Sequence, residues 1–169
     1  MDLQAALKEQ YRAGLAMLAE CVEKCPDDLW TAGEHPRPFW RIAFHAAFFT
    51  QLYLGADETV FEPWPGCHES DLRLFADPAY LEPYELPEET APYTQKEMLD
   101  YIAFVDSRLD SLIDALDLER DDPGISWYKN ITKLSFTLMN LRHIQGHVGQ
   151  LSELLMARGI DTDWVARGQ

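Results

Sequence analysis

A long apolar segment near the end of the chain carries two histidines four residues apart, and it limits the possible folds more than any other feature. The segment from Asn140 to Gln150 contains His143 and His147. In an α-helix, residues i and i+4 lie on one face, about 6 Å apart at Cβ. Two imidazoles with this spacing can bind one metal ion without distorting the backbone. Asn140 and Gln150 fall on the same polar stripe.

The other positions of this segment are apolar almost all the way round, which predicts a buried helix. They are Leu134, Leu138, Leu141, Ile144, Val148, Leu151, Leu154 and Leu155. A polar stripe inside a buried helix needs partners, because an unpaired buried polar group costs about 1–3 kcal/mol. A metal ion bound to both histidines would be one such partner.

Four segments have the periodicity of long helices. The expected helices run from about Leu3 to Lys24, from about Pro38 to Gly55, from the N-cap Thr94 to about Leu116, and from about Ile131 to Arg158. Thr94 and Glu97 have the spacing of a capping box, and Gly159 is a natural C′ residue for the last helix. Four long helices of this kind predict an all-α four-helix bundle.

The long connection between the second and third helices, residues 56–93, contains six prolines. Connections of this length inside a compact domain are usually functional or mobile. A short helical turn is possible at Asp71–Phe75. Elsewhere, Ile125–Tyr128 could pair briefly as a strand.

Length and charge restrict the class of protein. A chain of 169 residues predicts one domain, 1–169, with a substantial core. The formal net charge of −15 argues against nucleic acid and anionic membrane surfaces as partners. No run of 18 apolar residues predicts a membrane span, and the first residues lack the pattern of a signal peptide. The three cysteines favour a cytoplasmic protein, with Cys21 and Cys25 as ordinary buried thiols in preference to a ligand pair.

A third histidine lies in the second helix. His45 is surrounded in sequence by Phe44, Ala46 and Phe48, where a single histidine is usually a core residue. Because neighbouring helices of a bundle lie about 8–10 Å apart, His45 could complete a site with His143 and His147. Three protein ligands leave one coordination position open, which is the catalytic pattern for zinc. A zinc peptidase motif is excluded because Ile144 stands where glutamate is required.

This layout resembles the DinB-like (YfiT-type) superfamily of metal-dependent enzymes. The resemblance rests on an isolated histidine in the second helix and on the segment from Leu141 to Leu151, and it extends over nearly the whole chain. It implies an up-down-down-up bundle, a zinc or nickel ion held by His45, His143 and His147, and a homodimer. It also implies thiol-dependent S-transferase chemistry with a low-molecular-weight thiol, since some members of the family are enzymes of that kind.

The leading functional hypothesis is therefore a metal-dependent transferase or hydrolase that acts on a small molecule. The alternatives are a dimeric bundle that binds a metal or ligand without turnover, and a structural dimer whose histidines pack in the core. No motif identifies a general base; Glu62, Glu69 and Asp71 are available in the long connection. His35 and His68 are expected at the surface.

Overall fold

The computed structural model describes residues 2–69, 71, 86 and 88–168, and this part of the chain is helical without any β-strand. The elements are α1 (Leu3–Lys24), α2 (Asp27–Trp30), α3 (Phe39–Leu54), the 3₁₀ turn η1 (Glu58–Val60), α5 (Gln95–Asp114) and α6 (Lys133–Met156). The prediction of an all-α chain is confirmed. The four expected long helices are present, and their ends differ from the predicted ones by two residues or fewer. The short helix α2 and the turn η1 were not predicted.

Local signals in the sequence fix where the long helices begin and end. Thr94 and Glu97 form the predicted capping box, in which the Thr94 side chain accepts from the Glu97 N–H and the Glu97 carboxylate accepts from the Thr94 N–H. Gly159 has a φ of 74° after α6. There the Ile160 N–H donates to the Leu155 carbonyl, as in a Schellman motif. These two predictions are confirmed.

Two minor expectations have different outcomes. Residues 125–128 form a turn, in which the Tyr128 N–H donates to the Ile125 carbonyl, so the suggested strand pairing is wrong. Of the possible helical turn at Asp71–Phe75, all positions except Asp71 lie outside the described residues.

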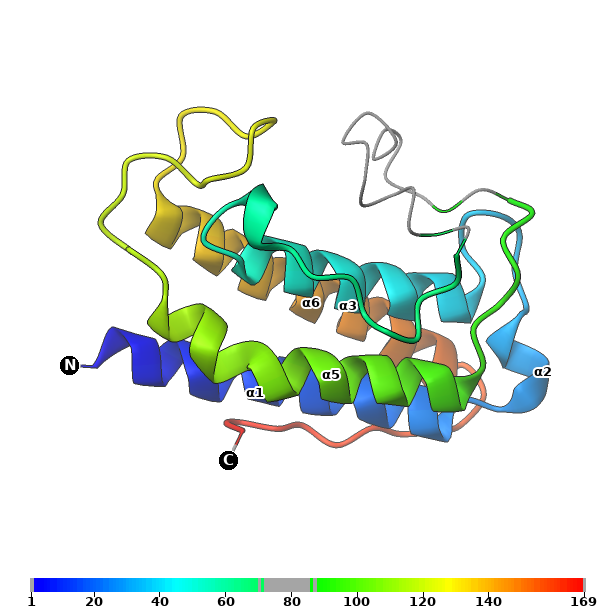
Figure 1. The fold of residues 1–169 in the computed structure, drawn as a ribbon. Helices are drawn as coiled ribbons and strands as arrows, with labels where there is room; N and C mark the ends of the chain where they lie inside the picture. Colours follow the sequence, from blue (N-terminus) through cyan, green and yellow to red (C-terminus); the bar gives the residue numbers. More distant parts are fainter. Residues whose placement is uncertain (1, 70, 72–85, 87, 169) are drawn as a thin grey trace.

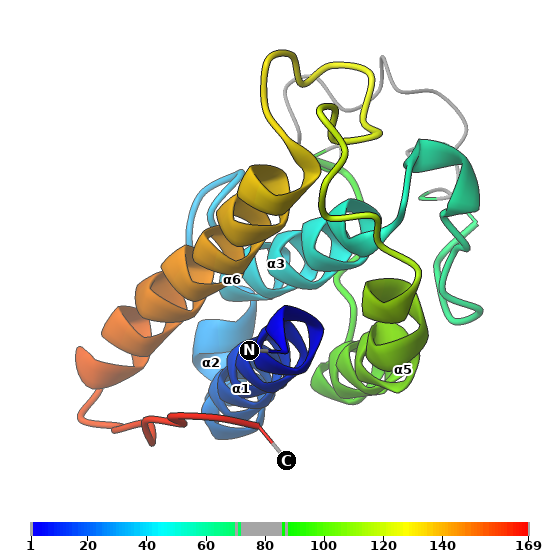
Figure 2. The same ribbon diagram turned by 90° about the vertical axis from the view of Figure 1, so that its left-hand side faces the viewer.

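The four long helices pack side by side. α3 contacts both α6 and α5, and α1 contacts the same two helices. Figure 2, which looks along the helices, shows α3 and α1 between α6 and α5. After α6 the chain turns back, and its last residues run along α1 (Figure 1), where the Gly168 N–H donates to the Glu9 carbonyl. Most buried apolar side chains lie between these helices in one continuous core.

α3 is the most deeply buried of the long helices. All of its residues are buried except His45, which is half-buried. Its apolar and aromatic side chains contact α6 on one side and α5 on the other. The position of His45 therefore marks the place where this helix approaches solvent.

α6 is less buried than its apolar sequence predicts. Ile144, Val148, Leu151 and Leu155 are fully buried, as expected. Leu138, however, is 47% exposed, and Leu134, Leu141 and Leu154 are only half-buried. The reason is that α6 contacts α3 and α1 on one side, while its opposite side has no neighbouring helix among the described residues. The prediction of a helix buried all round is wrong.

Along the described residues, none of the helices is both long enough and apolar enough to cross a membrane.

Candidate metal centre

Three histidines from two helices converge at one point. His45 lies on α3, and His143 and His147 lie one turn apart on α6. The Nε2 atom of His143 is 3.2 Å from Nε2 of His45 and 3.0 Å from Nε2 of His147. All three candidate ligand atoms lie within 4.8 Å of one another. The structure thus brings together the three residues that the sequence predicted as ligands.

These distances fit a shared metal ion better than a shared proton. A neutral imidazole nitrogen either donates or accepts one hydrogen bond, so Nε2 of His143 cannot make two good hydrogen bonds to its two neighbours. A divalent ion, by contrast, takes a lone pair from each nitrogen. Ligand nitrogens about 2.0–2.1 Å from a tetrahedral zinc ion lie about 3.3 Å apart, close to the spacings found here.

The ring of His147 is held by a second hydrogen bond. Its Nδ1 atom lies 2.8 Å from Oε1 of Gln150. Because an amide oxygen only accepts, Nδ1 carries the proton and the Nε2 lone pair faces the other histidines. Outer partners of this kind orient metal-binding histidines. Nδ1 of His143 is buried and has no hydrogen-bond partner among the described residues.

The surroundings keep the α6 histidines uncharged. Burial, together with the positive charge that His147 can carry, lowers the pKa of His143 to about 4. Burial also lowers the pKa of His147, which Arg37 lowers further and the hydrogen bond to Gln150 partly restores. Neutral imidazoles are the form that binds metal, so the two residues need no proton release at neutral pH.

A small cavity adjoins the histidines. Its volume is about 150 Å³, and it is lined by His45, Phe49, Tyr53, Tyr128 and His143. The hydroxyl oxygens of Tyr53 and Tyr128 are 3.5 Å apart. Sequence reasoning missed the two tyrosines. Tyr53 lies eight residues after His45 on the same helix, which was a usable signal, whereas Tyr128 comes from an irregular connection and had none.

The carboxylates suggested by the sequence do not line this cavity. Glu62 forms an ion pair of 2.7 Å with Arg108, and Glu69 is exposed. Asp71 is buried and accepts a short hydrogen bond from the Tyr93 hydroxyl. Asp71 therefore joins the long connection to Tyr93, which lies two residues before the start of α5.

The other two histidines lie away from the cluster. His35 is exposed, with its Nε2 3.2 Å from the Leu86 carbonyl oxygen. His68 is half-buried and stacks on the ring of Tyr93, with 3.9 Å between ring centres. Its expected surface position is thus only partly correct.

The three cysteines are free thiols. Cys21 and Cys25 are buried, as predicted, and burial raises the pKa of Cys25 to about 12. Cys67 is half-buried, and burial raises its pKa to about 11. Protonated thiols are poor ligands and nucleophiles. Within the described part of the chain, only the three histidines form a cluster that could hold a metal ion.

Comparisons of the chain with protein-family models, with curated proteins and with solved structures found no match.

Proposed function

We propose that this protein binds one divalent metal ion, zinc or nickel, through His45, His143 and His147. The observation that carries the proposal is the convergence of three imidazole nitrogens at the only place where α3 approaches solvent. If the ion is zinc, we expect Nε2 distances of about 2.0–2.1 Å. Three ligands leave a position for a water molecule or a substrate, and the adjoining cavity gives that position room.

The proposed activity is metal-dependent transfer or hydrolysis on a small molecule, with thiol-dependent S-transfer as the first reaction to test. A bound divalent ion would lower the pKa of a water or thiol ligand and so provide a nucleophile at neutral pH. The chain itself orients His147 through Gln150 and surrounds the open side with aromatic rings. The likeness to the DinB-like superfamily is part of this proposal, as is an up-down-down-up bundle, which the helix directions in Figure 1 support.

The alternative is a protein that binds a metal or small ligand without turnover. One observation favours it: among the described residues that line the cavity beside the histidines there is no carboxylate. The two proposals share the metal site and differ only in whether a reaction takes place there.

Metal content measured on purified protein tests the shared part of the proposal. After chelation and reloading with zinc or nickel, we expect one ion per chain by elemental analysis and by calorimetric titration. His143→Ala should lose it, while His35→Ala, which changes an exposed histidine outside the cluster, should keep it. An equal metal content in both variants would exclude this site.

The reaction is tested separately on the loaded protein. Transfer of several small thiols to an aromatic electrophile, and hydrolysis of small esters, should be lost in His143→Ala and kept in His35→Ala. Full metal binding without either reaction in the native chain would favour the binding protein.

A further inference from the structure

Asn140 is the first residue of the polar stripe on α6, and it is fully buried, three residues before His143. Its Nδ2 atom donates to the backbone carbonyl of Thr50 at 3.1 Å. Thr50 lies on α3, five residues after His45. The amide of Asn140 thus joins the two helices that carry the three histidines, close to the point where His143 meets His45.

At this core position an amide lowers the folding stability. Its Oδ1 atom is buried and accepts no hydrogen bond within the described part of the chain. The Tyr11 hydroxyl lies beside the Asn140 side chain, but it has only one proton, which it donates to the Thr137 carbonyl at 2.6 Å. Because a buried acceptor without a donor destabilises the folded state, folding alone would favour an apolar side chain here.

What the amide provides is a directional contact between α3 and α6. Burial of apolar side chains is non-directional, so it tolerates small displacements of one helix along the other. A hydrogen bond requires a short distance and a suitable angle, and a single buried asparagine can fix the register of packed helices at a cost in stability. Asn140 makes such a contact about 4.5 Å along the helix from His143.

Lys133 makes the other directional contact at this end of α6, with the Gly55 carbonyl. It lies ten residues before His143, which is about 15 Å along the helix. Bending of α6 over that length could still move the histidine. Asn140 is therefore the better placed of the two residues to control the position of the His143 ring.

We propose that Asn140 is a positioning residue of the metal centre, which holds α6 in the register that places Nε2 of His143 3.2 Å from Nε2 of His45. This inference rests on the proposed function, because it concerns the geometry of the same three ligands. Residues that hold metal ligands in place affect metal affinity strongly, whereas the apolar core depends less on the exact register. Asn140 thus favours ligand geometry over folding stability.

Asn140→Leu separates metal affinity from stability, since leucine keeps the branched shape and removes both polar atoms. We expect the zinc affinity, measured by competition with a chromogenic chelator, to fall about 10- to 100-fold, as for other residues that hold metal ligands. The melting temperature of the metal-free protein should stay equal or rise, because the unpaired acceptor is gone. Asn140→Ala removes the same hydrogen bond without crowding the core, and it should show the same loss of affinity.

Thr137→Val is the matched control. Thr137 is fully buried on the same helix, three residues before Asn140, and its hydroxyl donates to the Lys133 carbonyl of α6 itself at 2.9 Å. The change is isosteric and leaves the bond between Asn140 and Thr50 in place. The zinc affinity of this variant should therefore equal that of the native protein.

Nuclear Overhauser contacts between the imidazole protons of His45 and His143 report the register without any metal. The two ring centres lie 5.2 Å apart in the structure. We expect these contacts in the metal-free native protein and in Thr137→Val. They should be weakened or lost in Asn140→Leu and in Asn140→Ala.

Native zinc affinity in folded Asn140→Leu and Asn140→Ala would overturn the inference. A lower melting temperature of both variants with native affinity would make Asn140 a residue of the fold alone, and unchanged ring contacts in both would exclude a role in the register. Failure of the proposed function is distinguishable, because the native protein would then not bind zinc, whereas the ring contacts of the metal-free proteins would still test the role of Asn140.

Discussion

His147 and Leu151 lie one turn apart on α6, yet they have different surroundings. His147 is half-buried and its Nε2 faces the other histidines, whereas Leu151 is fully buried in the apolar core. Replacing His147 with Ala should therefore remove the metal and leave most of the folding stability. Leu151→Ala should cost about 2–5 kcal/mol of the free energy of unfolding and keep the metal while the fold survives.

Thermal melts and metal content, measured on both variants, separate these two roles. The pair is a matched comparison, because each change truncates one side chain on the same helix. Retention of metal by His147→Ala, together with an unchanged melting temperature of Leu151→Ala, would mean that the faces of α6 are assigned wrongly.

The buried ring of His143 makes the metal-free protein sensitive to acid. Its pKa in the folded chain is about 4, compared with 6.5 for an exposed histidine. Between these values the unfolded chain binds more protons than the folded chain, so stability falls as the pH decreases from 6.5 to about 4 and is unaffected by this group above that window. After removal of metal with a chelator, we expect the melting temperature to fall across this range.

His143→Gln should flatten that dependence, whereas His35→Gln, at an exposed position, should leave it unchanged. Protonation of carboxylates whose pKa is lowered in the folded chain, such as Glu97 and Asp57, also destabilises the protein in acid. Their ordinary pKa values of 4.5 and 3.8 place that loss of stability at lower pH than the loss caused by His143. Identical pH profiles of native and His143→Gln protein would contradict the burial of this ring.

At the scale of the helices, a buried lysine joins the start of α6 to the end of α3. Nζ of Lys133 donates to the carbonyls of Gly55 at 2.6 Å, Pro123 at 2.8 Å and Ala56 at 3.1 Å. Burial lowers the pKa of Lys133 to about 8, so it stays protonated at neutral pH and its three N–H donors match three acceptors. This contact sets where α6 begins beside α3, and hence where His143 meets His45.

Lys133→Met should remove these three hydrogen bonds while keeping a long side chain. Carbonyls left buried without a donor cost about 1–3 kcal/mol each, so we expect the free energy of unfolding to fall by about 3 kcal/mol in urea titrations. The control is Lys129→Met, at an exposed position four residues earlier. Equal stability of the two variants would show that the carbonyls find other donors.

The helices could be predicted because their signals are local. Capping residues and apolar spacing located the ends of α1, α3, α5 and α6 to within two residues. The three histidines could be predicted for a related reason, since two share one helix face and the third lies on a helix of the same bundle. Contacts in which at least one partner lies in an irregular segment could not be predicted. Tyr128 reaches the cavity from a turn, and Lys133 is buried although lysine is normally exposed.

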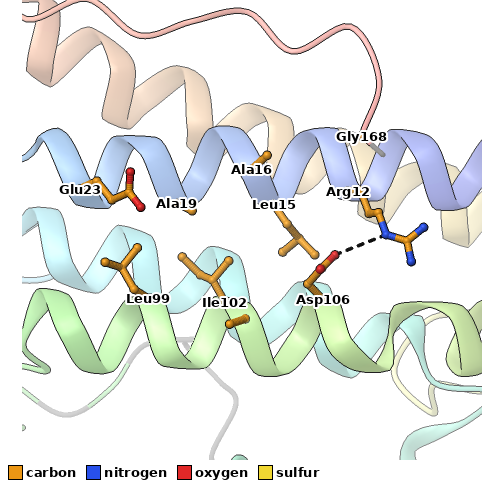
Figure 3. A pocket seen from close by; sticks show the side chains of 10 residues that line it. Arg12, Leu15, Ala16, Ala19, Glu23, Leu99, Ile102, Asp106 and Gly168 are labelled. Atoms are coloured by element: carbon orange, nitrogen blue, oxygen red, sulfur yellow. Dashed lines mark ion pairs between the residues drawn. The ribbon is translucent and has the colours of Figure 1, made fainter.

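On the whole-molecule scale, we place the predicted contact with a second copy of the chain in a groove between α1 and α5. Its volume is about 360 Å³. Leu15, Ala16 and Ala19 line it from α1, and Leu99, Ile102 and Ala103 line it from α5. Figure 3 shows Arg12 and Glu23 at opposite ends, with Arg12 paired to Asp106. A two-fold axis across this groove would bring Arg12 of one copy near the end that holds Glu23 in the other.

We expect a two-fold homodimer that buries well over about 1,000 Å² in total. The small exposed side chains of Ala16 and Ala103 would let two copies approach closely, so a long charged residue there should separate them. Light scattering at micromolar concentration should give twice the mass of the chain for the native protein and for Ser111→Lys, at an exposed position of α5 outside the groove. Ala103→Lys should shift the mass toward one chain. A monomeric native protein would contradict the dimer, and a dimeric Ala103→Lys would place the interface on another surface.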